Sequence, residues 1–135
     1  RLKMAETVFK KFDNVRVSDI EFKMSKPNFT IDTLKEFKKR HRYNNLILLI
    51  GEDNLVGFNK WKDYKKIIEI AEVYVYPRDT DQKIPNEILS NNNIKLVDAP
   101  KIKISSSRIR ELIKSKQSID SMVPKEVMKF LKLNN

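Results

Sequence analysis

The sequence predicts an α/β fold built on a mostly parallel sheet, and three observations support that fold class. Helical and strand-like segments alternate along most of the chain, as they do where helices connect parallel strands. Residues 46–50 are apolar at every position, which is typical of a strand in the middle of such a sheet. The length of 135 residues is that of one domain, so we expect residues 1–135 to form a single domain.

Helices are predicted where apolar residues recur with helical spacing. The first such stretch covers residues 2–12. The next begins with Thr30 as its N-cap and ends near residues 41–42, before a Tyr-Asn-Asn sequence. The same reasoning predicts further helical segments over residues 62–71, for one turn around Glu87, from the capping serines 105–107 to Lys114, and from Pro124 as a first helical residue.

Strands are predicted in short stretches rich in apolar and β-branched residues: 15–17, 46–50, 73–76 and 94–97. The predicted order is therefore helix, strand, helix, strand, helix, strand, strand, helix, helix. We find no internal repeat along the sequence and no change of composition that marks a second domain.

Residue counts exclude several classes of function. The chain has no cysteine, which rules out disulfides, thiolate metal sites and a cysteine nucleophile. Its one histidine, His41, stands between two arginines and is expected on the surface, and the two glycines form no glycine-rich phosphate loop. The sequence contains no apolar run of membrane-spanning length and begins without a signal-peptide pattern, so no membrane contact and a cytoplasmic location are expected.

The chain is strongly basic, with 28 Lys and Arg residues against 18 Asp and Glu residues and a formal net charge of +10. Such a charge favours an anionic partner, for example a nucleic acid or a phosphorylated metabolite. A composition rich in Lys, Asn and Ile, of the kind that an AT-rich genome imposes, explains the charge as well. The second interpretation is favoured, because lysines are scattered through every segment and asparagines form runs such as residues 91–93.

Candidate binding residues follow the predicted strands, because ligands of open parallel sheets bind at the carboxyl ends of the strands. Gly51 and Asp53 come directly after the apolar strand, and Arg78 follows the next one. The later serine-rich helix start adds Ser106 and Ser107 with Arg110 one turn further on. Unpaired N–H groups, serine hydroxyls and a guanidinium together suit a polyphosphate.

Several candidates also have a purely structural explanation, which the sequence leaves open. The serines are common N-caps, and Asp53 and Thr30 could likewise cap the helices that follow them. Trp61, the only tryptophan, could stack on a flat ligand ring or serve as a packing anchor.

Five sequence blocks occur in a fixed order. They are Phe-Thr-Ile-Asp-Thr-Leu at 29–34, Gly-Glu-Asp-Asn-Leu at 51–55 followed by Phe58 and Trp61, Val-Tyr-Pro-Arg at 75–78, Ile-Ser-Ser-Ser-Arg-Ile-Arg at 104–110, and Val-Pro at 123–124. Together they resemble the bacterial nicotinate-nucleotide adenylyltransferases, which have a Rossmann-like sheet. The serine–arginine block alone is shared by several nucleotidyltransferases, whereas the combination points to this one family.

The resemblance implies a transferase of NAD biosynthesis, which joins the adenylyl group of ATP to nicotinate mononucleotide and releases pyrophosphate. Mg²⁺ would arrive with ATP, with no dedicated metal site on the protein. The resemblance also implies a role for each matching residue: Ser106, Ser107 and Arg110 for the ATP phosphates, Gly51 and Asp53 for the nucleotide pocket, and Thr30, Trp61 and Arg78 for nicotinate mononucleotide.

The sequence departs from the family at its beginning. The family starts with a strand and a Gly-x-Phe-x-Pro-x-His-x-x-His motif whose histidines bind phosphate, but no histidine precedes His41 here. We therefore expect an N-terminally incomplete domain, with the missing segment lost or on another chain, and assign no catalytic residue. Without its first strand, the stretch 46–50 would lose a neighbour.

A second class of function stays open from the sequence, a non-catalytic basic α/β module that binds nucleotide or nucleic acid. The net charge of +10 and the absent histidine motif favour it. A nucleic-acid partner is less expected, because the sequence has no RNA-binding aromatic motif and no zinc module. The oligomeric state is open as well, a homo-oligomer included.

Overall fold

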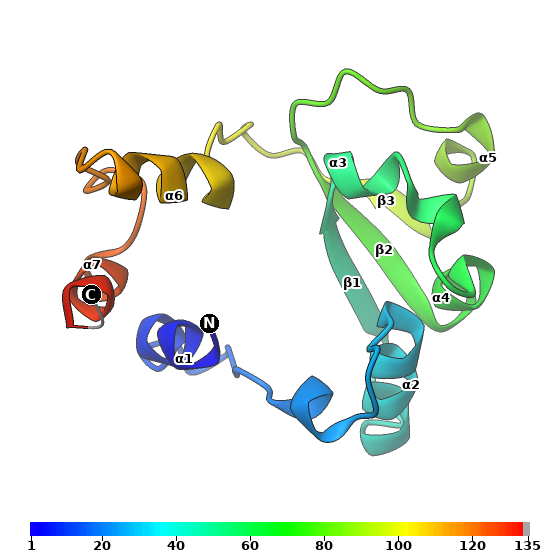
Figure 1. The fold of residues 1–135 in the computed structure, drawn as a ribbon. Helices are drawn as coiled ribbons and strands as arrows, with labels where there is room; N and C mark the ends of the chain where they lie inside the picture. The colour runs from blue at the N-terminus through cyan, green and yellow to red at the C-terminus, as the bar shows by residue number, and fades with distance from the viewer. Residues whose placement is uncertain (134–135) are drawn as a thin grey trace. The chain divides into compact units, whose positions relative to one another are not determined.

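The computed structural model describes residues 1–133, which form two compact units. The sheet unit is Met24–Lys103, coloured from light blue through green to yellow in Figure 1. The helical unit combines Arg1–Lys23 with the stretch that begins at Ile104. That residues 1–135 act as one domain stays a prediction.

Three parallel strands form the sheet within the described residues, and their order is β1-β2-β3 (Figure 1). β1 and β2 pair along their whole length, from Leu46 opposite Ala71 to Gly51 opposite Tyr76. The carboxyl ends of the strands therefore meet at one edge, and the predicted α/β fold with a parallel sheet is confirmed. The strand bounds are β1 Leu46–Gly51, β2 Ala71–Tyr76 and β3 Ile94–Leu96.

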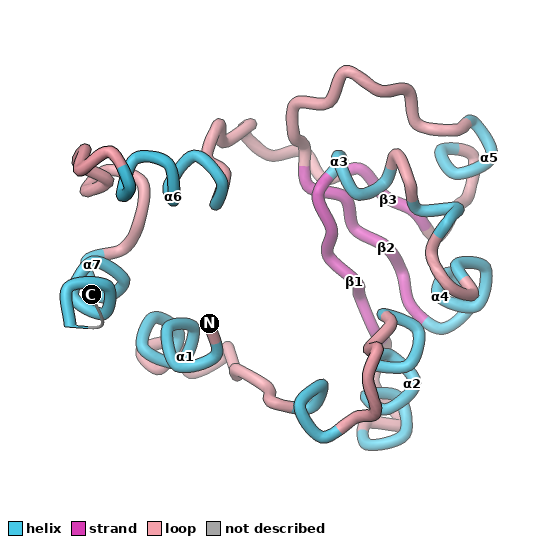
Figure 2. The backbone as a smooth tube through the Cα atoms, in the orientation of Figure 1, coloured by secondary structure: helices cyan, strands magenta, loops and turns pink. Residues whose placement is uncertain are grey.

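One face of the sheet builds the hydrophobic core of the sheet unit. Val73 and Val75 of β2 are fully buried in it, and Ile67 of α4 is fully buried against them. Burying each such side chain contributes roughly 1.5–3 kcal/mol, so this face anchors the unit. Figure 2 shows the short helices alongside the strands. The helices of the unit are α2 (Thr30–Arg40), α3 (Glu52–Leu55), η2 (Phe58–Lys60), α4 (Tyr64–Ile70) and α5 (Asn86–Leu89).

The prediction that the apolar strand lies in the middle of the sheet is wrong for the described strands. β1 is first in the order, so it has β2 as its only neighbour among them. Alternate side chains of β1 reach solvent, with Ile47 53% exposed and Leu49 64% exposed. The run is apolar on both faces, yet within this unit only one of its faces is covered.

Local backbone geometry shifts several predicted boundaries in the sheet unit. Thr30 is the first residue of α2 and not its cap, because the N–H groups of Asp32 and Thr33 donate to the carbonyl of Phe29, which makes Phe29 the N-cap. α4 begins only after Asp63, whose left-handed φ of 51° interrupts the helical backbone. The short helix η2 was not predicted, and the helix at α3 was raised from the sequence only through the alternative that Asp53 is a cap.

The helical unit is built around two helices from opposite ends of the chain. α1 packs against α7, and Lys11 Nζ lies 2.9 Å from Glu126 Oε1 between them. The hydrogen bond from Lys11 lowers the pKa of Glu126 below its ordinary value. The helices are α1 (Leu2–Phe9), η1 (Ile20–Lys23), α6 (Ser106–Lys114) and α7 (Lys125–Leu133).

Two predictions for this unit need correction. The predicted strand at residues 15–17 does not form; instead the Val15 N–H donates to the Phe12 carbonyl in a turn. A short β-branched stretch becomes a strand only when a partner strand lies beside it. Pro124 stands just before α7 rather than inside it, and its carbonyl accepts the first hydrogen bonds of the helix, from Val127 and Met128.

Among the described residues, no helix combines the length and the apolar character that crossing a bilayer would require.

Replacing Ile67 by Ala should destabilise the sheet unit by about 2–5 kcal/mol, because it leaves a cavity in a fully buried position. Urea unfolding followed by Trp61 fluorescence measures this, since the single tryptophan lies in the sheet unit. Leu49→Ala is the matched control, with an expected cost of about 0.5 kcal/mol or less because the side chain is 64% exposed. Equal effects of the two substitutions would contradict the assigned core.

Candidate functional site

The carboxyl ends of β1 and β2 carry an acid–arginine pair. α3 follows β1 directly and holds Asp53 in its first turn, while Arg78 comes shortly after β2. The Arg78 Nε lies 3.6 Å from Asp53 Oδ1, and the Arg78 backbone N–H donates to Glu52 Oε2 at 3.1 Å. Both side chains of the ion pair remain more than a third exposed, so a ligand can reach them. The pair therefore lies at the strand ends, as expected from the sequence, and its role in ligand binding stays a prediction.

Gly51 ends β1 at a point where no side chain fits. A Cβ atom there would lie 2.3 Å from Asp53 Oδ1 and 2.7 Å from Arg78 Cδ, well inside van der Waals contact. Any larger residue would therefore displace the two charged side chains. Gly51 is also the N-cap of α3, so the alternative that Asp53 caps this helix is wrong.

The serine-rich helix start lies in the helical unit, at the beginning of α6. Ser105 is the N-cap, and its Oγ accepts a hydrogen bond of 3.1 Å from the Arg108 N–H. The capping role thus falls to Ser105 alone. Ser106 and Ser107 form the exposed first turn, and Arg110 Nη2 donates to Ser107 Oγ at 3.2 Å. This bond holds the guanidinium beside the helix start, where backbone N–H groups already favour an anion.

The Trp61 pocket is a cavity of about 250 Å³ in the sheet unit. Trp61 is half-buried, and its ring centroid lies 5.2 Å from that of the fully buried Phe58. The indole is therefore both a packing anchor and a wall of the cavity, so the two interpretations of this residue are compatible. The lining residues are Asn28, Phe29, Thr30, Lys60, Trp61, Lys62 and Ile67.

The rim of the Trp61 pocket is positively charged. Lys62 Nζ lies 4.4 Å from the centroid of the Phe29 ring and donates to Asp32 Oδ2 at 3.0 Å. Lys60 lines the same cavity and is exposed. Thr30 stands in the wall as the first residue of α2, whose N-terminus adds a partial positive charge.

The predicted site residues fall into two groups, one in each unit. The structure brings Gly51, Asp53 and Arg78 together in the sheet unit, and it places Thr30 and Trp61 on one cavity of that unit. Ser106, Ser107 and Arg110 share the first turns of α6 in the helical unit. That both groups act on one nucleotide stays a prediction.

Two charged residues near these sites were not singled out from the sequence. Glu52 accepts a hydrogen bond from Arg78, 26 positions along the chain, and Lys62 pairs with Asp32, 30 positions away. No local spacing links such partners. From the sequence alone, Lys62 is indistinguishable from the solvated lysines around it. The fold places Asp32 beside it.

His41 is exposed at the end of α2, as predicted, and its ring stacks on Phe37 with centroids 6.4 Å apart. Within residues 1–133, no group of three or more His, Cys, Asp or Glu side chains is arranged to hold a metal ion.

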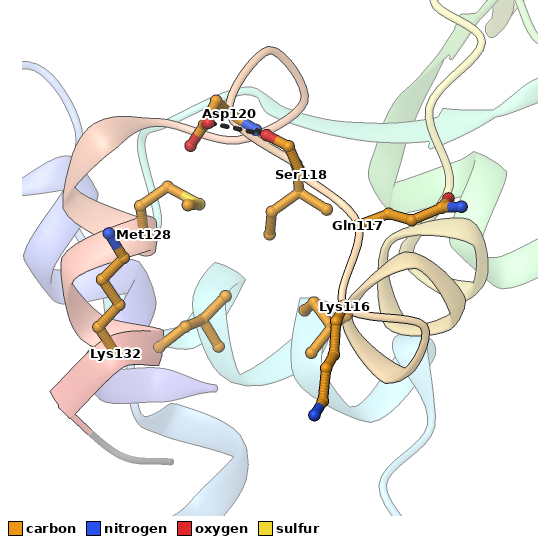
Figure 3. Close-up of a pocket in the computed structure, with 9 residues that line it drawn as sticks. Lys116, Gln117, Ser118, Asp120, Met128 and Lys132 are labelled. Atoms are coloured by element: carbon orange, nitrogen blue, oxygen red, sulfur yellow. Dashed lines mark hydrogen bonds between the residues drawn. The ribbon is translucent and has the colours of Figure 1, made fainter.

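A larger cavity of about 490 Å³ lies within the helical unit (Figure 3). Figure 3 shows Met128 and Lys132 of α7 on one side and Lys116, which follows α6, on the other. At its upper edge the Ser118 hydroxyl donates to Asp120 Oδ2 at 2.7 Å. None of the predicted site residues lines this cavity.

Comparison with known proteins identifies the family. A family model described as cytidylyltransferase-like matches residues 1–112. A probable nicotinate-nucleotide adenylyltransferase of Flavobacterium psychrophilum is 36% identical over 135 residues, which cover 100% of this chain and 70% of that protein. The protein of the same name from Cytophaga hutchinsonii is 40% identical over 117 residues, which cover 86% of this chain and 59% of that protein.

Two solved structures share the fold. A protein from Vibrio parahaemolyticus described as a putative nicotinate-nucleotide adenylyltransferase aligns with a TM-score of 0.68 at 20% identity, over 96% of this chain and 70% of that one. The nicotinic acid mononucleotide adenylyltransferase of Plasmodium falciparum aligns with a TM-score of 0.64 at 24% identity, over 82% and 59%. Since the family model covers most of the chain and relatives more than 30% identical carry the same name, this chain belongs to the nicotinate-nucleotide adenylyltransferase family.

Proposed function

We propose that this chain acts in NAD biosynthesis by transferring the adenylyl group of ATP to nicotinate mononucleotide, with release of pyrophosphate. Family membership supports the reaction. The observation that carries it in the structure is the sheet unit itself, which combines an aromatic-walled, cationic pocket with an arginine at the carboxyl edge of the sheet. A cytoplasmic location belongs to this proposal.

The reaction requires no nucleophile from the protein. A phosphate oxygen of nicotinate mononucleotide attacks the α-phosphorus of ATP, a new P–O bond forms, and the bond to the bridging oxygen breaks as pyrophosphate leaves. Positioning of the two phosphates and stabilisation of the developing charge do most of the work. A chain with no cysteine and a single surface histidine is compatible with such chemistry.

Each predicted residue has a role that its contacts support. Arg78, held by Asp53 and Glu52, would meet the phosphate of the mononucleotide. Gly51 keeps the space in which Asp53 could contact the nucleotide. Trp61 and Thr30 would enclose the nicotinate ring in their pocket. On α6, the phosphates of ATP would bind Ser106, Ser107 and Arg110.

Magnesium would enter as part of the substrate. Carried on the polyphosphate of ATP, Mg²⁺ keeps most of its ligands as phosphate oxygens and water. It therefore needs few ligands from the chain.

Pyrophosphate release from Mg-ATP and nicotinate mononucleotide tests the proposed function, with Trp61 fluorescence as a parallel measure of mononucleotide binding. Turnover that depends on both substrates is the expected result. Binding without pyrophosphate release would instead favour the alternative of a non-catalytic nucleotide-binding module. A steep loss of affinity for nucleic acid with increasing salt, without any response to mononucleotides, would favour a nucleic-acid binder.

Arg110→Ala should lower kcat/KM for ATP by roughly a hundredfold, because it removes a preorganised cation from the phosphate site. The side chain is exposed, so circular dichroism should show an unchanged fold. Arg108→Ala is the matched control on the same helix, since Arg108 pairs with Glu111 at 2.8 Å and should change kcat/KM little. Equal losses in both variants would remove the specific role of Arg110.

Gly51→Ala should weaken ATP usage by about tenfold or more, because the new methyl group would push aside Asp53, which is assigned to the nucleotide pocket. ATP titrations of the pyrophosphate assay measure the change. Gly57→Ala serves as the control, since a Cβ atom at Gly57 meets no other atom within 4 Å. Unaltered ATP usage in Gly51→Ala would show that Asp53 is not part of the nucleotide site.

A further inference from the structure

We propose that Lys62 is a specificity-determining residue of the Trp61 pocket, which makes the pocket prefer a pyridine ring that carries a carboxylate over the same ring with a carboxamide. This inference rests on the proposed function and adds the group that recognises the acid. A carboxylate and a carboxamide have nearly the same shape, so close-fitting walls cannot separate them. They differ in charge and in hydrogen bonding, because the amide NH2 donates where a carboxylate oxygen accepts, so a positively charged donor at the pocket can discriminate between them.

Lys62 holds a charge at the right place. Its side chain lines the pocket and is 45% exposed, so its ammonium group lies at the mouth rather than in the core. Two contacts fix it there: the Phe29 ring, 4.4 Å away by its centroid, and Asp32 Oδ2 at 3.0 Å. Phe29 is itself a lining residue of the pocket, so the ammonium group lies beside one of the pocket walls.

The ammonium group has capacity for a ligand. It carries three N–H donors, and the hydrogen bond to Asp32 uses one of them. A ligand carboxylate can therefore bind Lys62 while Asp32 keeps the side chain oriented. Because the contact already exists in the free protein, little conformational freedom is lost when the ligand binds.

The rest of the pocket lining favours the same sign of charge. Its seven lining residues include two lysines and no carboxylate. Phe29 and Thr30 form the N-cap and first residue of α2, an 11-residue helix whose positive end thus borders the cavity. Asp32 lies outside the lining and pairs with Lys62, so it partly neutralises the positive charge at the pocket.

A purely structural role for Lys62 predicts different behaviour. The Lys62–Asp32 pair would then only tie the segment before α4 to α2, and removing either partner would break the same contact. Lys62→Gln and Asp32→Asn would have like effects. If Lys62 recognises the acid, the two substitutions change the acid-to-amide affinity ratio in opposite directions. Lys62→Gln removes the positive charge, whereas Asp32→Asn removes the carboxylate that competes with the ligand for that charge.

The test measures the affinity of the full chain for nicotinate mononucleotide and for its amide by Trp61 fluorescence, with calorimetry as a second readout. The parent should bind the acid more tightly. Lys62→Gln should lower the acid-to-amide affinity ratio by about fivefold, which is the upper end of the contribution of an exposed ion pair. Asp32→Asn should raise the ratio, and Lys62→Arg should preserve it. Lys65→Gln, which removes an exposed lysine of α4 outside the pocket, should leave it unchanged.

The outcomes separate the inference from the proposed function. If the parent prefers the acid and Lys62→Gln retains that preference, or if Lys62→Gln and Asp32→Asn shift the ratio in the same direction, the inference on Lys62 is overturned while the pocket assignment stands. If neither mononucleotide changes the Trp61 signal or the heat of the parent chain, the assignment of the pocket fails, and the inference fails with it.

Discussion

In the parallel pair formed by β1 and β2, Gly51 lies opposite Tyr76, and this register governs the polar edge of the sheet unit. Asp53 and Arg78 stand at equivalent positions beyond these two strand ends, and 3.6 Å separates their charged groups. A shift of one residue would turn every side chain of a strand to the opposite face and expose the fully buried Val75. The apolar core therefore holds the ion pair in place, since an exposed ion pair contributes little to stability.

Two residues of the sheet unit combine a structural role with a proposed role in binding. Gly51 contributes by having no side chain, which leaves room for two charged groups where a strand ends. Trp61 packs against the buried Phe58 and also lines a cavity. Residues that anchor the core are held rigidly, so a ligand meets a surface that needs no rearrangement.

The cations assigned to ligands share one feature, a partner within the protein. Arg78 lies beside Asp53, Arg110 donates to Ser107, and Lys62 donates to Asp32. Each partner orients its cation before a ligand arrives, so little reorganisation is needed when an anionic group binds. The net charge of +10 is thus less informative than the few positive groups that the fold holds in position.

Local patterns sufficed for much of the fold and part of the site. Helical spacing predicted α2, α4 and α6, and runs of apolar residues predicted β1, β2 and β3. This works because the spacing of apolar residues within an element shows which of its faces is buried. The rule that ligands bind at strand ends led to Asp53 and Arg78. The predicted strand at 15–17, the Thr30 cap and the central place of β1 were wrong, because each depends on what lies beside the segment. Only the tertiary structure joined Lys62, which lines the Trp61 pocket, to Asp32, since a contact between residues 30 positions apart leaves no trace in local spacing.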